Sequence, residues 1–295
     1  MTETDWLAER FEENRDRLRG VAYRMLGSLG DADDAVQESW IRLGGVDADK
    51  IENLAGWLTT VVARVCLDML RSRKSRQEAP FDADTSEPIA RNGRGSDPER
   101  EALLADAVGL ALMVVLDTLT PAERLAFVLH ELFGASFDEI GATIGRSPAA
   151  ARQLASRARR RVQGTPKTSA ADLASQRGIV DAFLAALRAG DVEGLLAVLD
   201  PDVLVRTDIA GGSPDGPREV RGARTWATGA VTAARGARFA QPALVNGVVG
   251  IVVAPKGRLF RVLSFTIIRG RITQIEVIGD PERLGHLDLA VLTQA

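Results

Sequence analysis

An arginine-rich stretch, GRSPAAARQLASRARRRV at residues 145–162, holds six arginines and no acidic residue. The whole chain is mildly acidic, with 37 Lys and Arg against 40 Asp and Glu. A guanidinium group donates paired N–H groups to phosphate oxygens and to the edge of guanine, so this segregated charge favours a nucleic acid as partner. The alternative interpretation of a charge run is a solvated helix face.

Helical spacing divides the stretch into two faces. Placed at about 100° per residue, its apolar residues gather on one side: Ala151, Leu154, Ala155, Ala158 and Val162. The other side carries Arg152, Gln153, Ser156, Arg157, Arg159, Arg160 and Arg161. Ser147 is the expected N-cap, and Pro148 takes the first helical position. One face is therefore expected to dock on the protein while the other offers guanidinium groups to DNA.

Two helices are predicted directly before this one, because each begins with a capping box. The boxes pair Thr120 with Glu123, and Ser136 with Glu139. A tight Gly-Arg-Ser turn after Ile144 joins the second of these helices to the arginine helix. A short helix, a glycine-containing turn and an arginine-bearing helix predict a helix-turn-helix, which makes DNA binding the preferred interpretation.

Three more helices are predicted before residue 75, from helical spacing in WLAERFEENRDRLRGVAYRMLGSL, GDADDAVQESWIRL and NLAGWLTTVVARVCLDMLRSRK. Asp31 is the expected N-cap of the second helix. Trp40 and Trp57 are expected to be core anchors rather than DNA contacts. The single cysteine, Cys66, is expected to be a buried small hydrophobic residue, since alone it forms neither an internal disulfide nor a metal site.

Composition shifts divide the chain into three blocks. The expected organisation is a helical domain at 1–75, a linker at 76–100, a helix-turn-helix domain at 101–164, a short linker at 165–170 and a third domain at 171–295. The third block predicts two helices, the second capped by Asp191, and then a meander of about four strands with turns at 246–247, 255–257 and 269–270. The expected fold class is multidomain, with two all-α domains followed by an α+β domain.

Composition also limits the compartment. The chain has no run of about 18 apolar residues, which a membrane span requires, and its N-terminus is polar and acidic. We therefore expect a cytoplasmic protein without membrane association, metal or cofactor.

The helix-turn-helix block, LDTLTPAERLAFVLHELFGASFDEIGATIGRSPAAARQLASRARRRV, resembles region 4 of bacterial sigma factors of the extracytoplasmic-function (ECF) group. Independently, YRMLGSLGDADDAVQESWIRL resembles regions 2.1 and 2.2 of the same family, and NLAGWLTTVVARVCLDMLRSRK resembles regions 2.3 and 2.4. The resemblance implies a subunit that binds core RNA polymerase, at the β′ clamp helices and the β subunit, and directs it to promoter DNA.

The resemblance also implies roles for particular residues. Asp34, Gln37 and Glu38 would bind the clamp helices of polymerase. The loop at 44–56 would capture a flipped base of the −10 element, beside a helix that exposes Arg64, Asp68 and Arg71. The −35 element would be read by Ser147, Arg152, Gln153, Ser156, Arg159 and Arg160, with Arg152 and Ser156 nearest the bases and the last two arginines nearer the phosphates.

The third block resembles the SnoaL-like group of the NTF2-like fold, a cone with an interior pocket, as in sigma factors of the sigma-J type. Many members carry an aspartate followed by a glycine run, which only Asp208, Gly211 and Gly212 roughly match here. Some members of this fold are enzymes that use Asp with His or Tyr. This block has no Tyr, and its single histidine, His286, lies near the C-terminus, so no catalysis is expected. Asp208 and Asp215 are expected to serve turns.

Two functions remain open from the sequence. The first is a promoter-specificity subunit whose C-terminal domain regulates it, with or without a bound small molecule. The second is a ligand-responsive helix-turn-helix regulator that works without polymerase. The motif DADDAVQESW favours the first, because a repressor has no need of a polymerase-binding helix.

Overall fold

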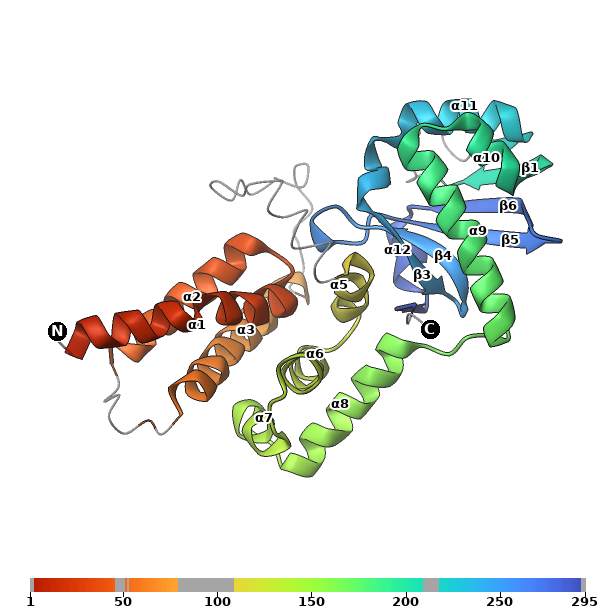
Figure 1. Cartoon of the computed structure of the whole chain (residues 1–295). Coiled ribbons are helices and arrows are strands. Elements are labelled where there is room, and N and C mark those ends of the chain that lie inside the picture. The colour runs from red at the N-terminus through yellow and green to blue at the C-terminus, as the bar shows by residue number, and fades with distance from the viewer. Residues whose placement is uncertain (1–2, 46–50, 52, 79–108, 209–217, 293–295) are drawn as a thin grey trace. The chain divides into compact units, whose positions relative to one another are not determined.

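The computed structural model describes residues 3–45, 51, 53–78, 109–208 and 218–292 (Figure 1). The chain falls into two compact units, one from residues 1–108 and 116–159 and the other from residues 109–115 and 160–295. None of the helices in the described ranges is long and apolar enough to cross a bilayer.

The first unit begins with three mutually packed helices, α1 (Glu3–Leu26), α2 (Leu29–Leu43) and α3 (Leu54–Glu78). Apolar residues at helical spacing form their common core, among them Leu18, Val21, Met25, Val36, Leu43, Leu58 and Val62. One boundary differs from the sequence expectation. Ser28, and not Asp31, is the N-cap of α2, because the Ser28 side chain accepts a hydrogen bond from the Asp31 backbone N–H. The Asp31 carboxylate instead pairs with Arg73 of α3 at 2.6 Å.

Cys66 lies in this core, as expected from the sequence, with none of its surface exposed. Burial raises the pKa of its thiol to about 12, so the thiolate is scarce at neutral pH. Trp40 is half-buried, and its ring lies 5.0 Å from that of the buried Phe11, in agreement with an anchoring role.

The helix-turn-helix block contains α5 (Leu110–Asp117), α6 (Pro121–Phe127), a π-helical turn at Val128–Leu132, α7 (Phe137–Ile144) and α8 (Pro148–Gln163). Both predicted capping boxes are confirmed: each hydroxyl accepts the backbone N–H of the glutamate, whose carboxylate accepts the backbone N–H of the cap. Because Ser136 donates to Glu139 through both its backbone and its hydroxyl, the pKa of that carboxyl is lowered.

The second unit is the predicted α+β domain, so the expected fold class is confirmed. Its helices are α9 (Ala170–Ala189), α10 (Val192–Val198), α11 (Ala223–Ala233) and α12 (Pro281–Gly285). Its strands are β1 (Leu199–Thr207), β2 (Arg218–Arg221), β3 (Ala240–Val245), β4 (Val248–Val253), β5 (Arg261–Ile268), β6 (Arg271–Ile278) and β7 (Leu289–Ala290). They form one sheet in the order β2-β1-β6-β5-β4-β3-β7, in which only β1 and β6 run parallel.

The four-stranded meander expected from the sequence corresponds to β3–β6. Its two tight turns have both central residues in the left-handed region, with φ of 52° and 83° at Asn246 and Gly247 and of 52° and 76° at Arg269 and Gly270. This is the turn geometry that matches the twist of a two-residue hairpin. Helices α9, α10 and α11 contact the sheet (Figure 1), and the fully buried Phe183 of α9 belongs to their shared core.

The end of α8 and the segment after it are bonded into this second unit. The Val162 carbonyl accepts a hydrogen bond from the Val291 backbone N–H just beyond β7, at 2.8 Å. The Lys167 backbone N–H donates to the Gly247 carbonyl in the β3–β4 turn, at 2.9 Å. The last turn of the arginine helix is therefore fixed to the sheet of the second unit.

Candidate nucleic-acid interface

Two glycines of α7 and its C-cap determine the shape of the turn in the helix-turn-helix. Gly145 ends α7 with φ of +69°, a conformation that residues with a side chain rarely adopt. Gly141 lies one turn earlier, and a Cβ added there would lie 2.7 Å from the Arg146 carbonyl oxygen and 3.2 Å from the Pro148 nitrogen. The absence of a side chain at Gly141 thus lets the turn pass close to α7, which sets the angle between α7 and α8.

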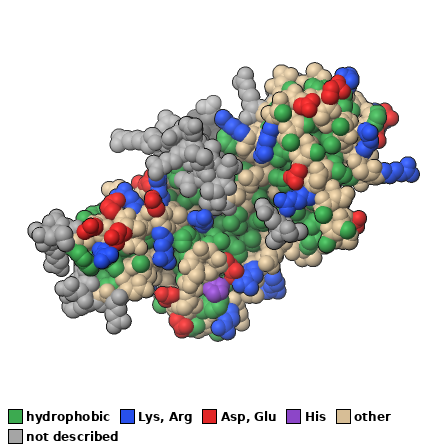
Figure 2. Space-filling view, in the orientation of Figure 1, with side chains coloured by type: hydrophobic (Ala, Val, Ile, Leu, Met, Phe, Trp, Pro, Cys, Tyr) green, Lys and Arg blue, Asp and Glu red, His purple; other side chains and the backbone are tan. Residues whose placement is uncertain are grey.

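Helix α8 has the two faces expected from its spacing. The five residues predicted to form its apolar face are buried: Ala151, Leu154, Ala155, Ala158 and Val162. Its polar residues are all exposed: Arg152, Gln153, Ser156, Arg157, Arg159, Arg160 and Arg161. Ser147 is exposed as well, and its hydroxyl accepts the Ala150 backbone N–H as an N-cap does. In Figure 2, Lys and Arg side chains gather over the region of α8.

Neighbouring side chains hold three of these arginines in place. The Arg152 guanidinium lies over the Phe137 ring, 5.1 Å from its centroid. Arg159 pairs with Glu131, whose hydrogen bond raises the pKa of this guanidinium. Arg157 pairs with Glu123 at 3.3 Å. Because the guanidinium groups of both pairs are exposed, solvent screens the two ion pairs and they contribute little to stability. A phosphate can therefore replace the carboxylate at little cost.

The predicted −10 residues share one exposed face of α3. Arg64, Asp68 and Arg71 are all exposed, opposite buried residues such as Val62 and Val65. Asp68 and Arg71 lie 3.9 Å apart. Arg64 is engaged within the first unit, because its Nη2 donates to the Ala142 carbonyl of α7 at 2.8 Å. Of the predicted base-capturing loop at 44–56, residues 46–50 and 52 lie outside the described residues.

The predicted polymerase-binding residues lie on α2. Asp34 and Gln37 are exposed, while Glu38 is half-buried and pairs with Arg42 at 3.1 Å. Sequence reasoning missed Ile41, which belongs to the same stripe and has 62% of its surface exposed. The signal was present in the sequence: positions 34, 37, 38 and 41 follow the i, i+3, i+4, i+7 spacing of one helix face.

In the second unit, Asp208 has a structural role. Its carboxylate accepts the backbone N–H groups of Gly279 and Asp280 and pairs with Arg283, which joins the end of β1 to the start of α12. Gly211, Gly212 and Asp215 lie outside the described residues. His286 is the C-cap of α12. Across the described ranges, no group of three His, Cys, Asp or Glu side chains could hold a metal ion.

Comparisons with known proteins match both helical blocks. The family model Sigma-70 region 2 matches residues 10–76, and Sigma-70, region 4 matches residues 109–162. A probable ECF RNA polymerase sigma factor, SigI of Mycobacterium tuberculosis, is 34% identical over 293 residues, which cover 97% of this chain and 98% of that protein. The ECF RNA polymerase sigma factor SigJ of the same organism is 36% identical over 286 residues, covering 92% and 91%. The crystal structure of M. tuberculosis SigJ aligns with 94% of this chain and 98% of that one, at 32% identity and a TM-score of 0.44.

Proposed function

Because the chain belongs to the extracytoplasmic-function sigma factors, which bind RNA polymerase and recognise promoters, we propose that three of its side-chain sets carry out these tasks. The α2 stripe of Asp34, Gln37, Glu38 and Ile41 binds the clamp helices of core polymerase. The exposed face of α3 binds the −10 element, and the arginine face of α8 reads the −35 element. The observation that carries the proposal is the division of α8, from Ala151 to Val162, into a buried apolar face and an exposed arginine face.

A regulator that acts without polymerase is not favoured, since the chain matches sigma region 2 at residues 10–76 besides the region 4 that holds the helix-turn-helix. The second unit, in our proposal, regulates the first without catalysing a reaction, and a small-molecule ligand for it stays a hypothesis. The bonded end of α8 supports regulation, because residues 160–163 of that helix belong to the second unit and a change in its sheet would act on them directly. The protein would work in the cytoplasm, where the promoter and polymerase are found.

Reversing the charge of the α2 stripe, with Asp34→Lys and Glu38→Lys together, is expected to abolish capture of core polymerase. Asp34 is exposed, and the half-buried Glu38 pairs with Arg42 one turn later on the same helix, so the fold should be little affected. Pull-down of core enzyme by the full-length chain measures the effect. The matched control is Glu9→Lys with Glu13→Lys, an equal charge change at exposed positions of α1. Equal capture by the stripe variant and the wild type would disprove this polymerase contact.

Arg152 and Arg159, at opposite ends of the α8 face, are expected to make different DNA contacts, the first to a base and the second to a phosphate. Arg152→Ala should cost about 1–3 kcal/mol and relax the preference at one −35 position, as loss of a base contact does. Arg159→Ala should weaken binding to every sequence and flatten its salt dependence, as loss of a phosphate contact does. Titration of matched and scrambled −35 duplexes at several salt concentrations measures both. Arg224→Ala, at an exposed arginine of α11, controls for the lost charge. Equal, sequence-independent losses would refute the base contact of Arg152.

A further inference from the structure

The contact that Arg152 makes differs from those of Arg64 and Arg124. Arg124 is 3% exposed, and its Nε donates to a carbonyl of α1 at 2.9 Å, while Arg64 donates to a carbonyl of α7. Both of these arginines use N–H groups for contacts within the protein. Arg152 is exposed, and its guanidinium lies over the Phe137 ring, 5.1 Å from the centroid. A contact with a ring uses the charge of the guanidinium and not its N–H donors, which therefore stay available to a base.

A second ring supports Phe137. The His130 ring lies 4.1 Å from that of Phe137, measured between centroids, with an angle of 31° between the two planes. Its orientation is fixed by a hydrogen bond of 3.0 Å between Nδ1 and the Ala135 carbonyl, in which Nδ1 donates because a carbonyl only accepts. Since ring contacts are favourable at such distances, the Phe137 ring cannot turn away without losing this support.

The backbone at Phe137 is fixed as well. Gly134 has φ of +69°, and the backbone N–H groups of Gly134 and Ala135 both donate to carbonyls of the π-helical turn at Val128–Leu132. The capping box of Ser136 then begins α7 at Phe137. A continuous set of hydrogen bonds therefore links the π-helical turn to the residue that carries the ring.

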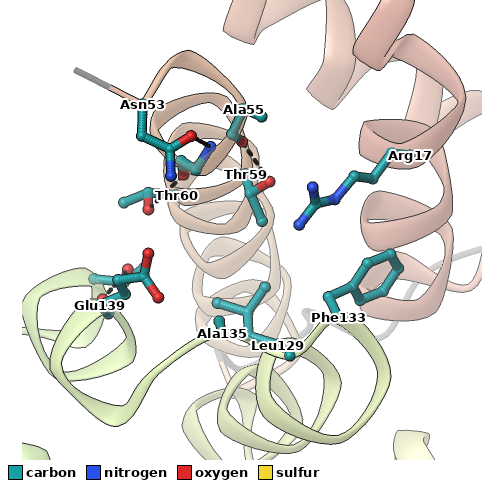
Figure 3. A pocket seen from close by; sticks show the side chains of 12 residues that line it. Arg17, Asn53, Ala55, Thr59, Thr60, Leu129, Phe133, Ala135 and Glu139 are labelled. Atoms are coloured by element: carbon teal, nitrogen blue, oxygen red, sulfur yellow. Dashed lines mark hydrogen bonds between the residues drawn. The ribbon is translucent and has the colours of Figure 1, made fainter. Parts of the chain in front are cut away.

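The neighbouring side chains of this segment have a different role. Leu129, Phe133 and Ala135 line a pocket of about 130 Å³, together with residues of α1 and α3 (Figure 3). Phe137 is not one of the residues that line this pocket. Its half-buried ring contacts the imidazole and the guanidinium instead.

An arginine that is held in place before it binds can distinguish bases more sharply. Its side chain has many rotamers, and ordering them on binding opposes the free energy gained. When the side chain is already ordered, its donors match only a base edge whose acceptors lie in the right positions. Arg159 is held differently, because Glu131 pairs with its N–H donors, which must leave the carboxylate before they bind DNA. Phe137 holds Arg152 without this competition.

We propose that Phe137 is a positioning residue for promoter recognition: its ring, supported by His130, holds Arg152 in the orientation that reads a −35 base. The proposal rests on the −35 function proposed for α8 and adds a residue outside the recognition helix. Phe137 acts through Arg152 and not through a base contact of its own. The sequence preference at the position that Arg152 reads therefore depends on the ring at residue 137.

Phe137→Met tests the proposal, because methionine keeps an apolar side chain of similar volume and removes the ring. The full-length chain is titrated with the matched −35 duplex and with duplexes in which each base pair is replaced in turn. The ratio of the two dissociation constants measures the preference at each position. This ratio is expected to fall at one position by about two- to fivefold, the range of an exposed contact between a cation and a ring. Binding to a scrambled duplex should change little.

Two further variants serve as controls. Phe137→Tyr keeps the ring and should keep the preference. Phe239→Met makes the same substitution at a half-buried ring of the second unit, where the Arg238 guanidinium lies 4.6 Å from the centroid, and should leave the preference unchanged. A purely structural role of Phe137 would instead weaken binding to matched and replaced duplexes alike, and the ratio would stay the same.

A double variant shows whether Phe137 acts through Arg152. With Arg152→Ala already present, Phe137→Met should not change the ratio further. An unchanged ratio in Phe137→Met alone, or an equal fall with and without Arg152, would overturn the proposal. If Arg152→Ala lowers the ratio and Phe137→Met does not, only the positioning role is wrong. If Arg152→Ala itself leaves the ratio unchanged, the base contact proposed for Arg152 is wrong, and the positioning role fails with it.

Discussion

Substituting Gly141 by valine is expected to reduce −35 binding to the non-specific level, a loss of about a thousandfold or more. Even a bare Cβ there lies 2.7 Å from the Arg146 carbonyl oxygen, and two further methyl groups would have to fit against the same backbone. Overpacking of this kind costs about 1–3 kcal/mol, more than the small gain in helix propensity on replacing glycine. The turn must therefore move and carry α8 away from its present angle. Duplex titration and thermal unfolding measure the two effects.

The control for this variant is Gly178→Val on α9. Gly178 also lies inside a helix, but an added Cβ there has no neighbour within 4 Å. The same substitution should therefore leave stability and DNA binding close to those of the wild type. Similar losses at the two positions would attribute the effect to valine in a helix rather than to the closeness of the turn.

Replacing Phe183 by alanine is expected to destabilise the second unit by about 3–5 kcal/mol. Its ring is fully buried, 5.7 Å from the ring of Trp226 and 5.2 Å from that of Phe265, so its loss leaves a cavity between α9, α11 and β5. Hydrogen exchange read out by mass spectrometry should show faster exchange in peptides from 170–292. Peptides from α1, α2 and α3 should keep their protection, because Phe183 belongs to the core of the other unit.

The conservative control, Phe183→Leu, retains most of the buried volume and should cost much less. Transcription assays with core RNA polymerase then test whether the buried cluster around Phe183 affects function. If the second unit regulates the first, promoter activity should change in the alanine variant and much less in the leucine variant. Unchanged activity with a loosened second unit would argue against regulation through its fold.

Much of this structure follows from short-range patterns. The capping boxes at Thr120 and Ser136 and the glycine turns of the meander act within a few residues, and all of them form as expected. The two faces of α8 follow from helical period alone. The N-cap of α2 was assigned wrongly because Asp31 and Ser28 are both good caps. What separates them is the pairing of Asp31 with Arg73, which lies 42 residues away.

Contacts between segments that are far apart in the sequence could not be predicted from the sequence. Nothing near Arg64 indicates that the carbonyl of Ala142 will accept a hydrogen bond from its guanidinium, and Arg124 appears in the sequence as one more charged helix residue. The exposed Ile41 was missed for another reason. An apolar residue on a helix is by default assigned to the core, and only the exposure of Ile41 in the structure assigns it to the surface stripe.

The bond between Val162 and Val291 bears on how such proteins are recombined. Domains are commonly exchanged at the loop between them, which here is the segment at 165–170. A chimaera joined there would combine the end of α8 from one parent with β7 from another. The residues that approach the Val162 carbonyl and Gly164 would then differ from Val291 and Ala290 of this chain. A functional chimaera should therefore take α8 and β7 from the same parent. The segment that must be exchanged as a whole is larger than the domain between the borders predicted from the sequence.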